Sequence, residues 1–330
     1  MSPGETRPAL REWTAVFAYV ALWVGYLPIG FVTQQRDVIA GLWVTEALAI
    51  ALPAVILVRG ANLRAASYLG LRAPALKQLA VAVVLAAANQ PVVSLLTWGS
   101  REVAPAAWVE EFDSFQRVMD VIFAGQAVPM IVTVSVAAPL GEELFFRGFA
   151  LPALQRGWGP AVAAIVSGAM FSLLHVNKVG FVGLWEIGIL LALLRLWSGS
   201  LWPSVLCHAV NNGIAGAAFL LGWEDPAIPP PPWFLALGGA LLVAGIVLAV
   251  RVVRRIPRPV PDEAALPGRE PARFQPLRAP LVGAIWLAGV LLSAGQLYHF
   301  LPPLPLTAWE GLGAAAALAT LTGLARNASA

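Results

Sequence analysis

The sequence predicts an all-α protein: a polytopic membrane helical bundle of about eight core transmembrane helices plus a C-terminal pair. Hydrophobic residues make up 59% of the 330 residues and charged residues only 12%, whereas soluble domains carry about 25% charged residues. The mean hydropathy is +0.76. Apolar runs of the length that a membrane helix needs, about 20 residues, recur along the whole chain. This composition excludes a water-soluble enzyme, a disordered chain and a coiled coil.

Each apolar run is a candidate helix with ends uncertain by a few residues. The fourth run is long, and Pro139 is the expected position of a kink within it. The turn 156–160 separates the fourth run from the fifth, which predicts an antiparallel hairpin. The runs cover residues 14–33, 38–58, 78–98, 121–155, 160–176, 179–197, 202–222, 232–252, 280–299 and 304–325.

The distribution of Lys and Arg predicts the orientation. With the N-terminus in the cytoplasm, sixteen of the 21 basic residues fall on the inner side and four on the outer side, and Arg147 remains within a run. The positive-inside rule therefore favours two cytoplasmic termini. The Arg-rich composition suits a bacterial protein, so we expect an integral protein of the bacterial inner membrane. A single cysteine, Cys207, excludes an internal disulfide.

The runs and their connections divide the chain into five predicted segments. No internal repeat is evident, which weighs against many transporter folds. The segments are N-terminal transmembrane helices at 1–120, a core at 121–222, an eighth transmembrane helix at 223–252, a basic Pro-rich cytoplasmic linker at 253–279 and the C-terminal transmembrane pair at 280–330.

Ionisable side chains gather within the apolar runs of the core. A charged group inside a membrane span is costly, so it is a functional hypothesis by default. Two of the three histidines of the chain lie in this core, near a pair of carboxylates. The polar residues concerned are Glu142, Glu143, Arg147, His175, His208 and Asn212.

The spacing of these residues predicts which of them meet. Glu143 and Arg147 are four apart on one helix face and are expected to pair. Glu142 lies 16 residues before Trp158, and His175 lies 17 residues after it. At about 1.5 Å per residue, both stand roughly 25 Å from the turn. The hairpin is therefore expected to bring the Glu142 carboxylate and the His175 imidazole together.

A buried carboxylate beside an imidazole suits the activation of water by general-base catalysis. A second histidine and an amide are donors suited to an oxyanion. A serine or cysteine nucleophile is less supported, because G-x-S-x-G is absent and Ser172 and Cys207 do not share the helix faces of the histidines. The zinc protease signature H-E-x-x-H is absent too. The residues thus favour a hydrolase of peptide bonds.

Three motifs in this order resemble the type II CAAX prenyl protease family, also called the CPBP or Abi family of intramembrane endopeptidases. They are E-E-x-x-x-R at 142–147, F-x-x-x-H at 171–175 and H-x-x-x-N at 208–212, and the segments 69–72 and 198–203 are also similar. The resemblance implies that 121–222 is the catalytic core and that the substrate is a membrane-anchored or lipidated protein or peptide. It implies that Glu142 and His175 activate water, that His208 and Asn212 stabilise the oxyanion, and that Glu143 and Arg147 have a structural or orienting role. Phe171 is expected to support the site by packing that orients His175.

Other interpretations remain open. The acidic pair and Arg147 suit a buried ion pair that fixes helix packing, and the histidines suit interhelical hydrogen bonds. Zinc is an alternative cofactor, with Glu142, His175 and His208 as ligands, although direct action of glutamate on water is favoured. A proton-coupled transporter and a non-catalytic immunity or partner protein are the alternative functions. The expected partners are the lipid bilayer and the substrate, with no nucleic acid.

Overall fold

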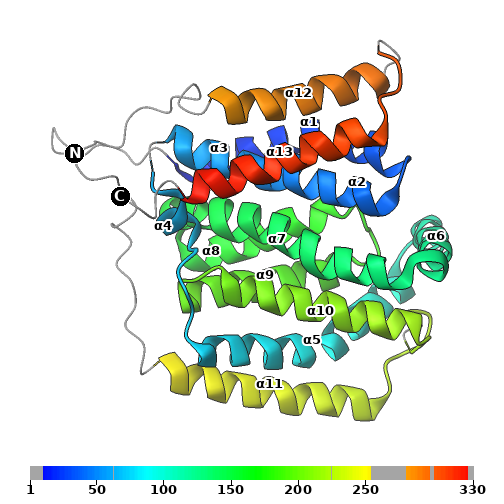
Figure 1. Ribbon diagram of the computed structural model, residues 1–330. Coiled ribbons are helices and arrows are strands. Elements are labelled where there is room, and N and C mark those ends of the chain that lie inside the picture. The colour runs from blue at the N-terminus through cyan, green and yellow to red at the C-terminus, as the bar shows by residue number, and fades with distance from the viewer. Residues whose placement is uncertain (1–9, 62, 224, 254–279, 298–300, 326–330) are drawn as a thin grey trace. The chain divides into compact units, whose positions relative to one another are not determined.

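A computed structural model of the chain describes residues 10–61, 63–223, 225–253, 280–297 and 301–325, and their regular structure is helical (Figure 1). The predicted all-α class is therefore confirmed for these residues. Six helical runs among them are long and apolar enough to cross a membrane: Glu12–Gln34, Val38–Gly60, Leu76–Val103, Ala106–Leu174, Phe181–Ser198 and Pro232–Arg251. The chain is thus a polytopic helical membrane protein. The predicted linker lies outside the described residues from 254 onward.

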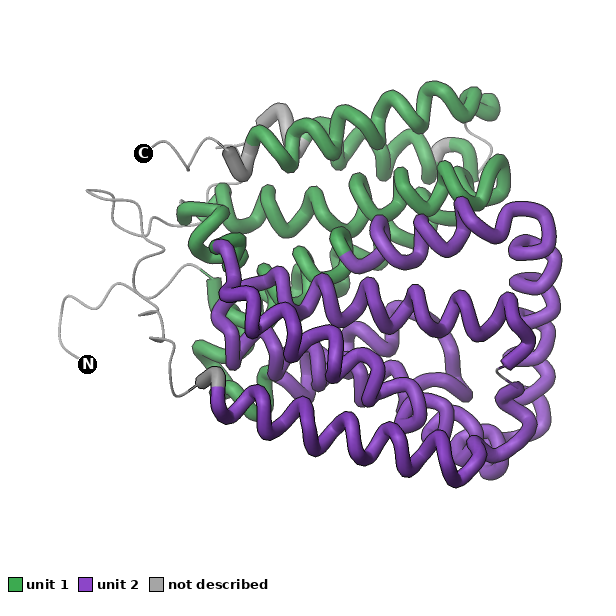
Figure 2. The backbone as a smooth tube through the Cα atoms, turned by 60° about the horizontal axis from the view of Figure 1, so that its bottom comes forward, with its two compact units in different colours: residues 1–72, 140–163, 259–330 green, residues 73–139, 164–258 purple. Residues whose placement is uncertain are grey.

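The chain forms two compact units, each assembled from distant segments (Figure 2). Unit 1 comprises residues 1–72, 140–163 and 259–330, and unit 2 comprises residues 73–139 and 164–258. The predicted segment boundaries at 120, 222, 252 and 279 stay predictions.

Unit 1 places the C-terminal helices against the first helices of the chain. Helix α1 contacts α2, the π-helical turn η1 and α12, and α13 contacts α2, η1 and α3. Glycines allow close approach: a Cβ on Gly41 would lie 2.6 Å from the backbone nitrogen of Gln34. The elements are α1 (Glu12–Gln34), α2 (Val38–Val44), η1 (Thr45–Ala51), α3 (Leu52–Gly60), α4 (Ala65–Leu69), α12 (Pro280–Leu297) and α13 (Leu306–Ala325).

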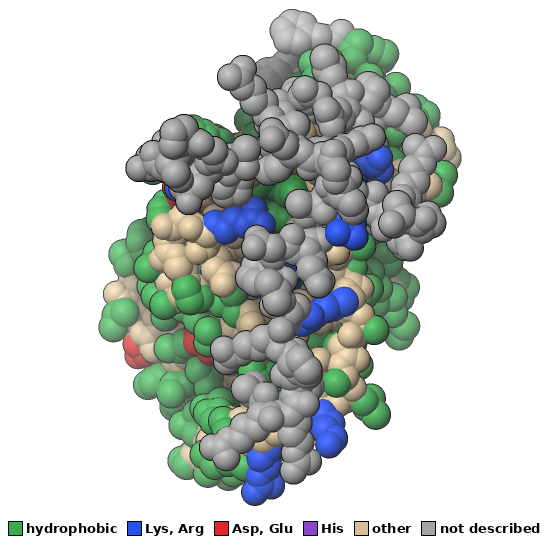
Figure 3. Space-filling view, turned by 90° about the vertical axis from the view of Figure 1, so that its left-hand side faces the viewer, with side chains coloured by type: hydrophobic (Ala, Val, Ile, Leu, Met, Phe, Trp, Pro, Cys, Tyr) green, Lys and Arg blue, Asp and Glu red, His purple; other side chains and the backbone are tan. Residues whose placement is uncertain are grey.

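An arginine makes a polar contact at each end of unit 1. At the expected inner end, Arg156 donates a hydrogen bond to the carbonyl of Leu10 and lies over the ring of Tyr68. Figure 3, viewed from the side of the molecule on which α4 lies, shows Lys and Arg side chains on that face and hydrophobic side chains along its flanks. At the expected outer end, Arg36 donates to Gln296 at 2.9 Å.

Unit 2 is built around α5 (Leu76–Val103), which contacts α9 (Phe181–Ser198), α10 (Trp202–Leu220) and α11 (Pro232–Val253). It also contains α6 (Ala106–Val132), the π-helical turn η2 (Thr133–Ala137) and the last part of α8 (Leu151–Leu174). Helices α8 and α9 cross at two glycines. A Cβ on Gly188 would lie 2.7 Å from the Cα of Gly168, so small residues set this close contact, as is common between membrane helices.

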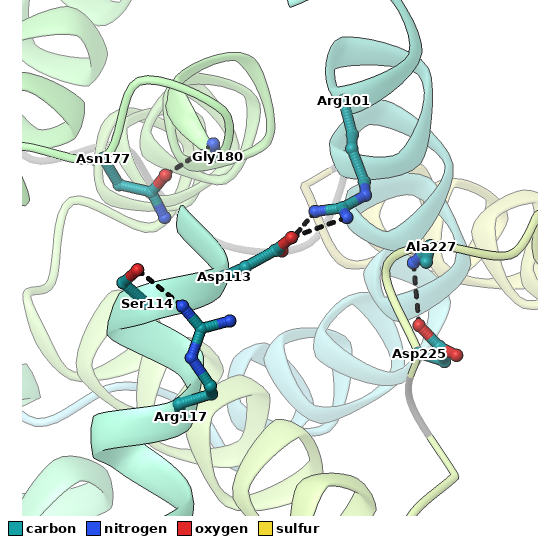
Figure 4. Close-up of polar contacts among 8 residues, drawn as sticks. All are labelled: Arg101, Asp113, Ser114, Arg117, Asn177, Gly180, Asp225 and Ala227. Atoms are coloured by element: carbon teal, nitrogen blue, oxygen red, sulfur yellow. Dashed lines mark hydrogen bonds and ion pairs between the residues drawn. The ribbon is translucent and has the colours of Figure 1, made fainter. Parts of the chain in front are cut away.

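Polar contacts gather at the end of unit 2 that is predicted to face outward (Figure 4). Arg101 and Asp113 form an ion pair there, and Lys178 pairs with Glu111. The opposite end joins the start of α5 to the end of α9, where Gln78 donates a hydrogen bond to the carbonyl of Ser198. The predicted outer loops of unit 2 therefore meet at one end, and helix ends predicted to be cytoplasmic meet at the other.

The long helical run from 106 to 174 contains two residues with non-helical backbone. Non-helical backbone angles occur at Gln126 and at Gly159, where φ is +77°. Pro129 explains the first bend, because a proline ring clashes with the carbonyl four residues earlier. Gly159 lies within the predicted turn 156–160. The π-helical turn η2 ends at Ala137, shortly before Pro139, and the kink expected at Pro139 stays a prediction.

Candidate active site

The first motif lies where α7 (Ala138–Glu143) continues into the π-helical turn η3 (Leu144–Ala150). The predicted ion pair is present: Nη1 of Arg147 donates to Oε1 of Glu143 at 2.8 Å, and neither side chain is exposed. Glu142 is also buried, with 6% of its surface exposed. These residues belong to unit 1. A charge pair without solvent keeps η3 in one conformation, because separating the charges there is costly.

The segment 69–72 supports η3 from α4. Gly70 adopts a left-handed conformation with φ of +75°, and it ends α4 with a hydrogen bond from Leu71 to the carbonyl of Ala66. This turn directs Leu69 toward Gly148 of η3, where a Cβ would lie 3.2 Å from the Leu69 side chain. Tyr68 donates a hydrogen bond to the carbonyl of Phe149. The segment that resembles the family in sequence therefore contacts the turn that carries Arg147.

His175 follows the last residue of α8 in unit 2, and its side chain is exposed. Its backbone nitrogen bonds the carbonyl of Ser172, so the carbonyl of Phe171 is left for the imidazole, whose Nδ1 lies 3.0 Å away. A carbonyl only accepts hydrogen bonds, so the proton of the neutral ring is on Nδ1 and the lone pair is on Nε2. This tautomer leaves Nε2 able to accept a hydrogen bond from a water molecule.

Phe171 lies against both histidines of unit 2. Its ring centroid is 4.8 Å from that of His175 and 5.4 Å from that of His208. His208 is buried in α10, with 3% of its surface exposed. Phe171 is itself buried, so it packs against an imidazole at the end of α8 and another on α10. This contact extends the predicted supporting role of Phe171 from one histidine to both.

Asn212, one turn after His208, contacts the π-helical turn η2 in the same unit. Its Nδ2 donates a hydrogen bond to the carbonyl of Val134 at 2.8 Å. In η2 the amide of Ala138 bonds the carbonyl of Thr133, and Pro139 has no amide proton. The wide turn and the proline thus deprive the Val134 carbonyl of its usual partners, and Asn212 supplies one. An amide nitrogen carries two protons, so one remains for an oxyanion.

The surroundings of Ser172 and Cys207, which lie next to the histidines in sequence, suit a structural role. Ser172 donates a hydrogen bond to the carbonyl of Phe181 at 2.7 Å, and Cys207 is fully buried. Within each unit, no three His, Cys, Asp or Glu side chains of the described residues come together to hold a metal ion. The approach of Glu142 to His175 that was predicted from their equal depth stays a prediction.

Comparison with known proteins supports the motif resemblance. The family described as type II CAAX prenyl endopeptidase Rce1-like matches residues 124–214. The protein named "Putative membrane peptidase YdiL" from Bacillus subtilis (strain 168) is 28% identical over 103 residues, which is 31% of this chain and 41% of the relative. The chain thus covers less than half of that relative. No solved structure matches the chain. The three motifs all lie within the matched region, and residues 124–214 are thereby confirmed as a region similar to the Rce1-like type II CAAX prenyl endopeptidase family.

Proposed function

We propose that the protein is an intramembrane endopeptidase that hydrolyses a peptide bond near the membrane end of a membrane-anchored or lipidated protein or peptide. The single observation that carries the proposal is the family match over 124–214, because it contains all three motifs in order. The burial of Glu142 and His208 and the tautomer of His175 support it. The protein lies in a bacterial inner membrane, with eight core spans, a C-terminal pair and both termini in the cytoplasm.

In this mechanism Glu142 and His175 hold the attacking water, and Glu142 takes its proton. The hydroxide oxygen bonds to the carbonyl carbon of the substrate, and the carbonyl oxygen becomes an oxyanion. His208 and Asn212 donate hydrogen bonds to that oxyanion. The carbon–nitrogen bond then breaks, and the proton held by Glu142 passes to the leaving amine. Glu143 and Arg147 keep η3, and with it the backbone beside Glu142, in place.

The decisive experiment uses the purified protein in lipid vesicles with a fluorogenic peptide that carries a membrane anchor. The wild-type protein cleaves it, and Glu142→Gln loses cleavage while the unfolding transition is retained. A lost general base costs about 10²- to 10⁴-fold in rate. Equal cleavage by the wild type and Glu142→Gln would refute the proposal. An immunity protein would keep its protection in this variant, and a proton-coupled transporter would lose pH-driven uptake.

A chelator arm separates the glutamate mechanism from zinc chemistry. A zinc site made by Glu142, His175 and His208 needs ligands from both units, and the residues of neither unit provide three ligands alone. Water activation by Glu142 requires no metal ion. Activity that survives a strong chelator, with no stoichiometric zinc on metal analysis, supports direct action of Glu142. Activity lost to the chelator and restored by zinc would reassign His208 from oxyanion donor to ligand.

A further inference from the structure

A buried acidic side chain outside the three motifs lies near Glu142 in unit 1. Glu46 is in the first turn of η1, within the second helical run of the chain, and only 7% of its surface is exposed. None of the three motifs includes it.

The contact is made at Gly141, the residue before Glu142. A Cβ on Gly141 would overlap Oε2 of Glu46, and it would lie 3.1 Å from the carbonyl oxygen and 3.2 Å from the Cβ of Glu46. The Glu46 side chain therefore runs along the backbone of α7 where only glycine leaves room. Glu46 interacts electrostatically with Glu142, and Tyr26 of α1 interacts with both carboxyl groups.

The Glu46 carboxyl group has no hydrogen bond on its buried oxygen. Oε2 accepts none from the residues that the structure describes. A buried carboxylate without donors is costly, and two adjacent carboxylates repel strongly in a low-dielectric interior. The pair is stable when one carboxyl carries a proton and donates it in a hydrogen bond to the other, as paired acids do in other enzymes.

We propose that Glu46 is a positioning residue for Glu142. Its protonated carboxyl group donates a hydrogen bond to the Glu142 carboxylate and fixes the direction in which that carboxylate faces the water. This inference rests on the proposed function, because it assigns Glu46 a role in the rate of the same reaction. No bond of the substrate is made or broken by Glu46.

The test compares Glu46→Gln with Glu46→Met. The amide of Gln still donates a hydrogen bond to Glu142, so kcat stays within about threefold of the wild type, whereas Met removes the donor. The loss of one hydrogen bond to a charged group lowers kcat about 10- to 100-fold, with KM unchanged. A merely structural role would change the amount of folded protein but not kcat per folded molecule. A Met variant with wild-type kcat, or a Gln variant as slow as the Met variant, would overturn the proposal.

Glu12 offers a matched control in the same unit. It is also a buried glutamate, 8% exposed, and its carboxyl group fills the space where a Cβ on Gly157 would lie. Glu12→Met therefore removes the same chemical group from another close helix contact, on α1 rather than η1, where Glu12 also pairs with Arg11 at 3.5 Å. We expect it to lower the unfolding midpoint while kcat per folded molecule stays at the wild-type value.

A double-mutant cycle tests the pair without any cleavage assay. Glu46→Met and Glu142→Met each leave one buried carboxyl without its partner, so the double variant loses less thermal stability than the sum of the two. The stability losses of Glu12→Met and Glu142→Met should be additive. Additive losses for Glu46 and Glu142 would overturn the proposal whatever the activity. If the stability losses at Glu46 and Glu142 are coupled but the protein cleaves no substrate, the interaction between the two carboxyl groups is supported and the proposed function is rejected.

Discussion

The buried Glu143–Arg147 ion pair is expected to stabilise η3. Both side chains are fully buried and joined at 2.8 Å, and the guanidinium lies 5.8 Å from the centre of the Phe146 ring. Glu143→Met leaves the positive charge buried without this counter-ion, which costs about 3–5 kcal/mol. Since 1.4 kcal/mol is a factor of ten in an equilibrium constant, the ratio of unfolded to folded protein increases by a factor of about one hundred to a few thousand.

The second variant distinguishes a charge effect from a packing effect. Replacing both residues with methionine removes both charges and keeps similar volumes, which is often neutral or stabilising for buried pairs. We therefore expect the double variant to recover most of the stability that Glu143→Met loses. The measurement is the unfolding midpoint in detergent, where the single variant should fall by about 6–20 °C.

Two results would refute this reasoning. A single variant that unfolds at the wild-type midpoint would show that the pair contributes little in this interior. A double variant as unstable as the single one would show that shape, not charge, is what η3 requires. Stability is the readout here rather than cleavage, because Glu143 adjoins Glu142.

Two further predictions concern topology and helix packing. A reporter fused after Arg64 should be cytoplasmic and one inserted near Glu111 should be external; a cytoplasmic signal near Glu111 would reject the orientation. Gly188→Ala places a Cβ 2.7 Å from the Cα of Gly168 and should cost about 1–3 kcal/mol of stability. The control Gly99→Ala, with open space around the new Cβ, should be neutral or stabilising. Equal unfolding midpoints for the two variants would show that the α8–α9 contact relaxes without cost.

Hydropathy predicted most of the helices because the length and apolarity of a membrane span are properties of the sequence alone. The run at 179–197 corresponds to α9 (Phe181–Ser198), and 202–222 corresponds to α10 (Trp202–Leu220). The i,i+4 spacing also predicted the Glu143–Arg147 pair, since a helix fixes which residues share a face.

The contacts between helices were not predictable in the same way. Packing of α12 and α13 on α1 and η1 depends on where glycines meet partners from distant segments, such as Gly289 against Leu48. Glu46 is a lone acidic residue in an apolar run, and that was the one signal that could have found it. Its neighbour Gly141 shows its meaning only in three dimensions.

Asn212 combines a structural contact with a proposed catalytic role, and Pro139 offers a way to separate them. Asn212→Ala removes the donor to the Val134 carbonyl and one donor to the oxyanion, so it should lower both stability and cleavage. One lost oxyanion donor costs about 10²- to 10³-fold in kcat. Pro139→Ala supplies a backbone N–H to the carbonyls of η2, so adding it to Asn212→Ala should restore part of the lost stability. Cleavage should not return with it, because the oxyanion still lacks its amide donor. If the double variant regained both stability and cleavage, Asn212 would act only by maintaining the conformation of η2. His208 would then stabilise the oxyanion without Asn212.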